Sequence, residues 1–189
     1  IVEVLEQRSV AASTVQEQAQ AEGLSLMFQL VLQTAMRMRE LCTLQQAQIR
    51  IEEKTIYLSK SKNGDRRQVP LNRQARVLLE ASWVALDATR EGGQFLPFWD
   101  GRSDPKALAA TTARLSRMFA DVFAEAQSDD LHFHDSRHEA LCRWVLGSRV
   151  LTSEQLGRWA GMQCFGAVTV TAPLTRIQQR PAWPAASPR

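Results

Sequence analysis

Four residues of this chain have side chains that could bind and activate a phosphate group: Arg37, Lys62, His134 and Arg137. Glu40 follows Arg37 by three residues, and its carboxylate can hold the guanidinium in a fixed orientation that suits a phosphate. His134 and Arg137 are also three residues apart, which places a titratable ring beside a permanent cation. These residue types predict an acid/base group next to an anion clamp.

A metal site is a competing interpretation of the segment 131–139. It contains His132, His134 and His138, and histidine is a common ligand of zinc. A usable site also requires carboxylate or cysteine partners at suitable spacing, whereas the three cysteines are far apart and form no C-x-x-C pair. We therefore expect no metal and no cofactor, and a metal-dependent hydrolase stays the third of three candidate functions.

The elements that must position these residues are mostly helical. The segment 24–36 is rich in Leu and Met, which favours a buried helix that carries Arg37 at its far end. Helical patterns return further along the chain, and the whole set of expected helices lies within residues 1–45, 72–80, 105–127, 135–146 and 153–159.

A β-hairpin is predicted between these helices. Segments 49–58 and 67–71 have strand character, and Asn63-Gly64 between them is a turn signal. Lys62 therefore lies at the approach to the turn. Because Arg66 and Arg67 flank this basic tip, we predict that they contact a DNA backbone.

Length and composition are compatible with these expectations without requiring them. The chain has 189 residues, enough for one domain with a core, and its net charge of +3 permits a basic groove. The cysteine usage fits a reducing cytoplasm, and no apolar run approaches membrane-spanning length. The first residue is Ile1, from which we expect that the chain begins inside a longer polypeptide.

Three segments in this order resemble the catalytic domain of the tyrosine recombinase (phage integrase) family. They are residues 34–41, 62–71 and 131–140, and the resemblance covers about residues 20–162. Each segment alone is a weak signal, whereas the ordered trio is a strong one. The resemblance implies an α+β, mainly helical fold with a small antiparallel β-sheet or hairpin, and a function in DNA recombination or integration for a mobile element.

The resemblance also implies roles for the site residues. Arg37 and Arg137 would hold the non-bridging oxygens of the scissile phosphate, with Glu40 supporting Arg37. Lys62 would protonate the leaving 5′ oxygen, and His134 would manage the proton of the nucleophile or stabilise the phosphate. Strand cleavage in the family proceeds through a 3′-phosphotyrosine, so that rejoining needs no nucleotide cofactor.

Two positions depart from the family pattern. A second His or Trp is expected where Met162 stands, although Arg158 or Trp159 also fit the spacing, and a thioether cannot donate a hydrogen bond. The nucleophilic tyrosine is expected near Thr171, yet no tyrosine follows Tyr57. Tyr57 lies in the strand before the Lys62 hairpin, where we expect a half-buried sheet aromatic.

The composition changes after Met162. Residues 163–189 contain no Asp or Glu and four of the seven prolines, so we expect an atypical, irregular tail after a catalytic domain at 1–162. A lost reading frame near Gln163 is our hypothesis for this change. The family's N-terminal DNA-binding domain is not expected within this chain.

The expected function is that of a catalytically defective, DNA-binding integrase-like fragment whose partner is double-stranded DNA. The main alternative is a non-catalytic DNA-binding or regulatory fragment. Family members act as homotetramers on DNA by exchanging their C-terminal segments, and an aberrant tail would affect that assembly.

Overall fold

The computed structural model describes residues 1–58, 67–86 and 93–147. Along the chain its elements are α1 (Val2–Val10), α2 (Val15–Thr34), α3 (Met38–Cys42), the short helix η1 (Gln46–Gln48), β1 (Ile49–Arg50), β2 (Thr55–Leu58), β3 (Arg67–Pro70), α4 (Arg73–Leu86), α5 (Pro105–Glu125) and α6 (Phe133–Gly147). This is the mainly helical α+β architecture with a small sheet that the sequence predicts, and the predicted fold class is confirmed.

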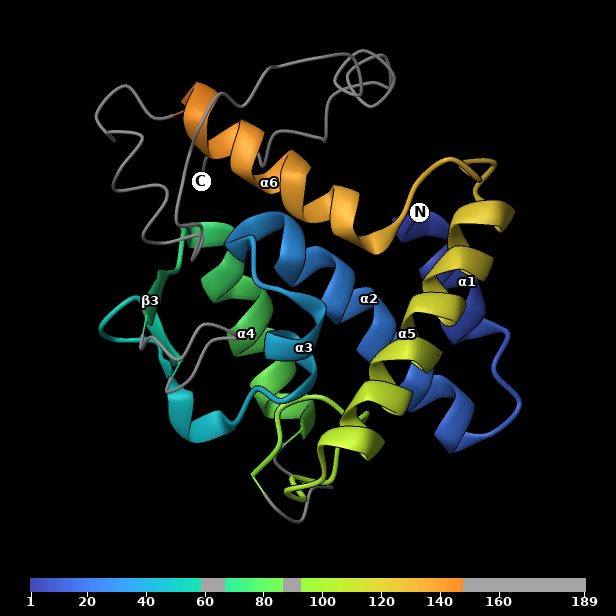
Figure 1. Cartoon of the computed structure of the whole chain (residues 1–189), viewed down its shortest axis with the longest axis horizontal. Coiled ribbons are helices and arrows are strands. Elements are labelled where there is room, and N and C mark those ends of the chain that lie inside the picture. Colours follow the sequence, from blue (N-terminus) through green and yellow to red (C-terminus); the bar gives the residue numbers. More distant parts are fainter. Residues whose placement is uncertain (59–66, 87–92, 148–189) are drawn as a thin grey trace.

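Helix α2 is the centre of the domain, with α1, α4 and α6 packed against it (Figure 1). It begins at Val15 because Thr14 and Glu17 form a reciprocal cap. The Thr14 hydroxyl accepts from the Glu17 amide at 3.1 Å, and the Glu17 carboxylate accepts from the Thr14 amide at 3.2 Å. Residues 15–20, which are rich in Gln and Glu, thus form the first part of the helix. No helix in the described ranges is long and apolar enough to cross a bilayer.

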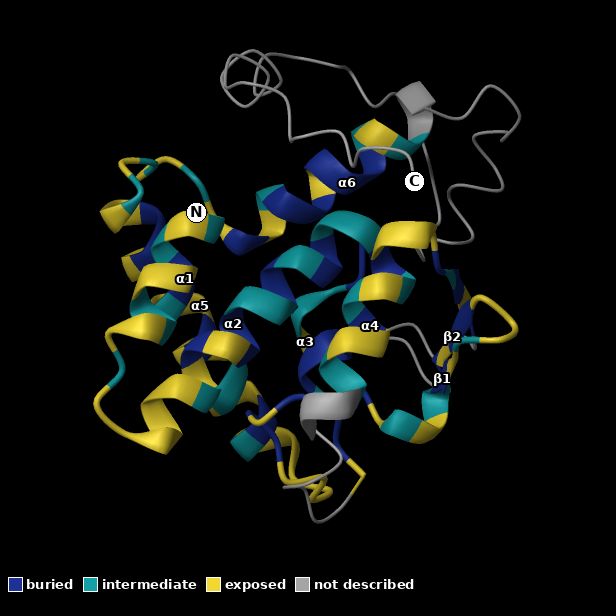
Figure 2. Cartoon of the chain, turned by 180° about the vertical axis from the view of Figure 1, so that it is seen from behind, coloured by how far each residue is buried: buried dark blue, intermediate teal, exposed yellow. Residues whose placement is uncertain are grey.

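An aromatic cluster joins α2 to α5 and to the start of α6. Phe28, Phe119, Phe123 and Phe133 contribute the rings, whose centroids lie 4.5–6.5 Å apart in the contacting pairs. Such aromatic contacts add to the free energy gained by burying the rings. Figure 2 shows buried and intermediate residues along α2 and exposed residues on the outer face of α4. The cluster fixes the beginning of α6, the helix that carries His134 and Arg137.

The sheet lies at one edge of the domain and has the order β1-β2-β3, with both pairs antiparallel. The segment predicted as one strand over 49–58 is instead two strands. The chain turns between them, where Lys54 has a positive φ of 54° and donates its amide hydrogen bond to Ile51. Leu58 pairs with Arg67, so β2 and β3 frame the hairpin whose tip lies outside the described residues.

Gly23 marks a close approach between α2 and the segment 93–99. A Cβ atom at this position would lie 2.9 Å from the ring of Pro97 and 2.9 Å from the ring of Phe98. Gly23→Ala would gain about 1 kcal/mol of helix propensity. We expect overpacking to outweigh this gain, with a net loss of about 1 kcal/mol in the free energy of unfolding measured by urea titration.

Pro97→Ala in the same background is the matched test, because it removes one of the two contacts. The double variant should recover part of the loss. A Gly23→Ala protein that is more stable than the parent would show that the loop moves away freely.

Candidate active site

The end of α2 is shaped by a left-handed residue. Ala35 has φ 50° and ψ 27°, and its amide donates to Val31 at 2.9 Å, which closes the helix. The chain then turns into the extended Arg37, with φ −74° and ψ 151°, which is the residue that precedes α3. Helix α2 ends at Thr34, before Arg37 is reached. The prediction that Arg37 lies at the far end of the apolar helix is therefore wrong.

The predicted contact between Arg37 and Glu40 forms, but for a different reason. The two residues do not share a helical face; Arg37 caps α3 and Glu40 lies in its first turn. The Glu40 carboxylate accepts the backbone amide of Arg37 at 2.8 Å and its guanidinium Nη1 at 3.1 Å. One carboxylate therefore fixes both the main chain and the side chain of Arg37.

Arg67 is a second guanidinium on the same carboxylate. It extends from the first residue of β3, and its Nη2 donates to Glu40 Oε2 at 2.5 Å. Its side chain is 5% exposed, so the structure does not place it on the outer surface of the hairpin, where a DNA backbone contact was predicted. Arg67 is therefore a buried partner of Glu40, the residue that also holds Arg37.

The charges around Glu40 keep it ionised. Burial raises the pKa of Glu40, but the charges and hydrogen bonds of Arg67 and Arg37 outweigh it, so the pKa lies below the ordinary value. Burial likewise lowers the pKa of Arg67, against the opposing effect of Glu40. The carboxylate is shared between two cations and does not neutralise the site.

Arg137 reaches the same region from α6. It is 4% exposed, and its Nη1 donates a hydrogen bond to the backbone carbonyl of Ala35. Burial, together with the nearby charges of Arg37 and Arg67, lowers the pKa of Arg137 to about 10. The guanidinium remains protonated at neutral pH. Three arginine side chains and the Glu40 carboxylate therefore lie in one region of the described structure.

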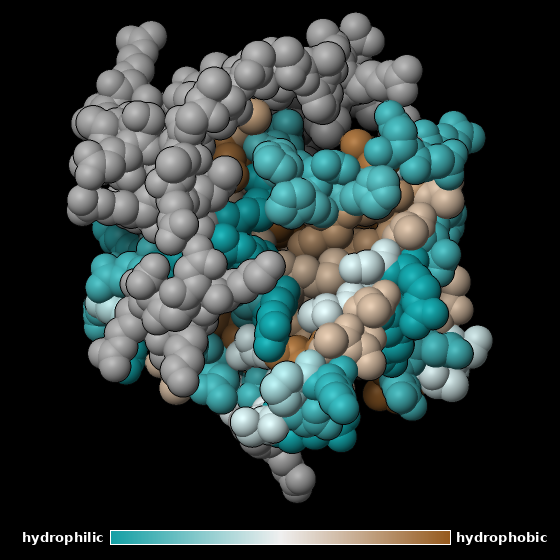
Figure 3. Space-filling view, in the orientation of Figure 1, coloured by the Kyte–Doolittle hydropathy of each residue, from teal (hydrophilic) through white to brown (hydrophobic). Residues whose placement is uncertain are grey.

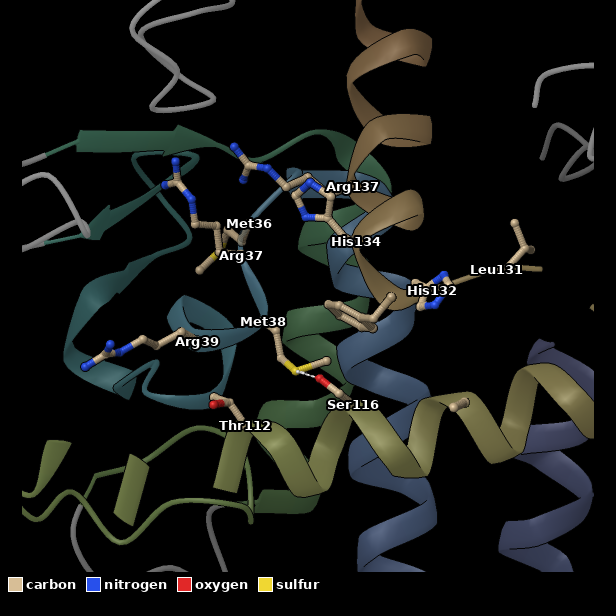
Figure 4. Close-up of a pocket in the computed structure, with 12 residues that line it drawn as sticks. Met36, Arg37, Met38, Arg39, Thr112, Ser116, Leu131, His132, His134 and Arg137 are labelled. Carbon is tan, nitrogen blue, oxygen red and sulfur yellow. Dashed lines mark hydrogen bonds between the residues drawn. The ribbon is translucent and has the colours of Figure 1, made fainter. Parts of the chain in front are cut away.

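His134 lies beside Arg137 at the start of α6 (Figure 4). Its ring meets that of His138 edge to face, with centroids 4.7 Å apart. Burial, and then the neighbouring His138 and Arg137, lower the pKa of His134 below 6.5, while Asp135 acts in the opposite direction. The imidazole is thus neutral at pH 7, able to accept a proton at one nitrogen and donate at the other.

This lowered pKa links folding to pH. As pH falls below about 6.5, the unfolded chain takes up a proton on His134 more readily than the folded chain, so the free energy of unfolding should decrease. Urea titrations over a pH series measure this slope. His134→Gln should reduce the slope, because it removes the group whose pKa the fold lowers. An unchanged slope in His134→Gln would contradict the lowered pKa.

The three histidines are not brought together as a metal site. His132 is 81% exposed, its Nδ1 lies 3.7 Å from the Asp135 carboxylate, and its side chain points away from His134 and Arg137 (Figure 4). Within residues 1–58, 67–86 and 93–147, no three His, Cys, Asp or Glu side chains form a group that could hold a metal ion. The residues present do not fit the metal-hydrolase alternative.

A pocket of about 400 Å³ opens beside the cations. Its wall comes from the segment 36–39, from α5 and from the start of α6, and it includes Arg37, His134 and Arg137. Figure 4 shows the guanidinium groups of Arg37 and Arg137 on the same side of the site, with the ring of His134 beside Arg137. The structure therefore joins the predicted Arg37, His134 and Arg137 at one cavity.

The remaining predicted positions lie outside the described residues: Lys62, Arg66, Met162 and Thr171. Their predicted roles stay predictions. Tyr57 is described, and its ring is 39% exposed on β2. Its hydroxyl donates to Glu53 at 3.0 Å, and this hydrogen bond to a carboxylate raises the pKa of Tyr57. A raised pKa is the opposite of what activates a phenol as a nucleophile.

Two contacts of the site were missed in the sequence: the one between Arg67, which was predicted to contact DNA, and Glu40, and the one between Arg137 and the Ala35 carbonyl. Arg67 alternates with Val69 and Leu71, both buried, so the period of a strand already assigns it to the inner face. Ala35 has no such signal, because alanine is an uncommon residue at a left-handed position.

This mainly helical fold is shared with solved structures of recombinases. The model of the phage integrase family matches residues 5–146, and the chain belongs to this family. Over 126 residues it is 35% identical to a shufflon-specific DNA recombinase of Escherichia coli, an alignment that spans 66% of this chain and 28% of that protein.

Solved structures show the same fold at low sequence identity. The XerA recombinase superposes with a TM-score of 0.60 and 16% identity, over 86% of this chain and 53% of that one. The XerH site-specific recombinase, bound to palindromic difH substrate in a post-cleavage complex, gives a TM-score of 0.58 and 15% identity, over 86% and 44%. The chain thus spans about half the length of these structures and less than a third of the curated relative.

Proposed function

We propose that this chain binds double-stranded DNA and holds one backbone phosphate between Arg37 and Arg137. The observation that carries the proposal is the pocket that Arg37, His134 and Arg137 line together, where the Glu40 carboxylate fixes Arg37 and the Ala35 carbonyl fixes Arg137. Phosphate oxygens are the natural partners of paired arginines. Membership of the phage integrase family and the DNA complex of the XerH relative support the same ligand.

The reaction class that this geometry serves is site-specific DNA strand cleavage and rejoining, as in DNA recombination or integration. The buried guanidinium of Arg137 and the partly exposed one of Arg37 would stabilise the extra negative charge of a pentacoordinate transition state. The neutral imidazole of His134 would take up or supply a proton beside it. Lys62, from the hairpin tip that β2 and β3 frame, is the proposed proton donor to the leaving 5′ oxygen.

This sequence has no tyrosine at the position where the family pattern predicts the nucleophile. No tyrosine follows Tyr57, and the hydrogen bond to Glu53 makes the Tyr57 phenol harder to ionise. We therefore propose that the chain, with Met162 and Thr171 at the positions of the second histidine and the nucleophile, occupies DNA without forming a phosphotyrosine. The missing tyrosine favours a regulatory role, in which the bound chain competes for the DNA without cleaving it.

A nicked suicide DNA substrate tests both halves of the proposal. Fluorescence anisotropy should show binding that weakens in Arg37→Ala, while a denaturing gel shows no covalent protein-DNA adduct. Arg102→Ala, an exposed arginine before α5, is the matched control and should bind as the parent does. Sedimentation of the complex measures how many copies assemble on the DNA.

Each contrary result has a distinct meaning. A covalent adduct on the gel would overturn the proposal that the chain forms no phosphotyrosine. Cleavage that stops on addition of EDTA supports the metal hydrolase instead. Equal affinity for DNA in Arg37→Ala and in the parent removes the proposed phosphate site.

A further inference from the structure

The pocket extends beyond the residues that would hold a phosphate. From Arg37 and Arg137 it continues along α5, where Thr112, Ser116 and Ala120 form one wall. Its volume of about 400 Å³ lies in the range of about 300–1,000 Å³ typical of small-molecule sites. Figure 3 shows apolar surface in the middle of the molecule, between hydrophilic residues above and below.

The walls of this part of the pocket combine apolar side chains with hydroxyl groups. Met38 supplies thioether surface, and Phe133, which is 7% exposed, adds a small area of phenyl surface. The Ser116 hydroxyl donates to the sulfur of Met38 at 3.5 Å, a weak acceptor, so it can turn to a better partner at little cost. The site therefore offers an apolar contact with a hydrogen-bonding group beside it.

The charge of the lining is one-sided. Three arginines and two histidines line the pocket, whereas none of its described lining residues is an Asp or Glu. Apolar surface beside arginines and histidines matches a group that is apolar and planar but attached to anions. A nucleobase, linked through its sugar to phosphates on both sides, has that chemistry.

We infer that this pocket receives a single unpaired nucleobase next to the phosphate held by Arg37 and Arg137. The inference rests on the proposed DNA function. The base would lie against the Met38 thioether and the Phe133 ring, with its edge toward Ser116. Continuity with the phosphate site, and the absence of carboxylates among the lining residues that the structure describes, favour a nucleotide over an apolar protein segment.

Such a pocket lowers the free energy of a DNA conformation in which one base has left the stack. Extruding a paired base requires unpairing and unstacking, whereas a base without a partner is already partly released. The protein should therefore distinguish DNA by whether a base is free, in addition to binding its backbone. That preference is a property beyond phosphate binding and can be measured separately.

The probe is a short DNA duplex with 2-aminopurine opposite an abasic position, compared with the same duplex fully paired. We expect the parent protein to bind the unpaired probe at least about fivefold tighter, the lower end of what stacking of one base contributes. The fluorescence of 2-aminopurine should change on binding, because its stacking neighbours are exchanged for protein side chains.

Pocket-filling variants on α5 test the location. Ser116→Leu and Ala120→Leu lie four residues apart on its exposed side and enlarge side chains that line the pocket. The ratio of the two affinities should fall toward one in these variants. Ala113→Leu, on an exposed position of α5 that does not line the pocket, should keep the ratio of the parent.

The outcomes separate this inference from the proposed function. Arg137-dependent binding of both probes at equal affinity, or a ratio that survives both leucine variants, overturns the base pocket and leaves the function standing. Failure to bind either probe overturns both. A pocket-filling variant that abolishes self-association in sedimentation, with no change in the ratio, assigns the pocket to protein and overturns the inference.

Discussion

Replacing Glu40 by glutamine should lower the free energy of unfolding by about 3–5 kcal/mol, the range found when one partner of a buried ion pair is removed. Glu40 is 8% exposed and is the acceptor for Arg67, whose own side chain is 5% exposed. Without the carboxylate charge, Arg37, Arg67 and Arg137 would repel one another in a poorly solvated region. Urea titration followed by circular dichroism measures the loss.

Two further variants make the result specific. Glu139→Gln removes a carboxylate of the same burial, 9% exposed, whose partner Arg143 is 49% exposed. Its loss should be about 1 kcal/mol or less, because Arg143 can be solvated. Glu40→Gln combined with Arg67→Met should recover part of the loss, since the stranded cation is then gone. Equal losses in Glu40→Gln and Glu139→Gln would contradict the shared-carboxylate account.

Replacing Arg137 by methionine should weaken duplex DNA binding by about 2–3 kcal/mol, roughly 30- to 150-fold. Arg137 is 4% exposed and is aimed by the Ala35 carbonyl, so a phosphate contact there would be well desolvated. The slope of log affinity against log salt should decrease by about one, the contribution of one phosphate contact. Anisotropy titrations at several salt concentrations measure both quantities.

Arg137→Lys separates charge from geometry. A lysine keeps the positive charge but loses the planar fork, so we expect an affinity between those of the parent and Arg137→Met. Circular dichroism first establishes that each variant is folded. An Arg137→Met protein that is folded and binds DNA with the affinity and salt slope of the parent would remove Arg137 from the phosphate site.

Much of the fold could be predicted because helix signals are local. The apolar run of α2 and the Pro105 start of α5 each act over a few residues, and these two helices lie within the segments 1–45 and 105–127 that were predicted to be helical. The break between β1 and β2 was missed because Lys54 adopts a left-handed conformation that its residue type does not announce.

Residues of the site could be predicted from the sequence, but most of the contacts that hold them could not. Arg37, His134 and Arg137 were identified from type and spacing, and the structure places them at one pocket. Their partners depend on the tertiary fold. Arg67 meets Glu40 across 27 residues, and Arg137 meets Ala35 across 102, distances over which spacing carries no information.

The left-handed Ala35 also determines where the chain can tolerate change. Its carbonyl positions Arg137, and two residues later the amide of Arg37 is held by Glu40, so a single short stretch sets the spacing of Arg37 and Arg137. Substituting a side chain in this stretch alters one contact. Inserting one residue would instead turn either the carbonyl or the amide away from its partner, so residues 35–37 are constrained in length more strictly than in identity.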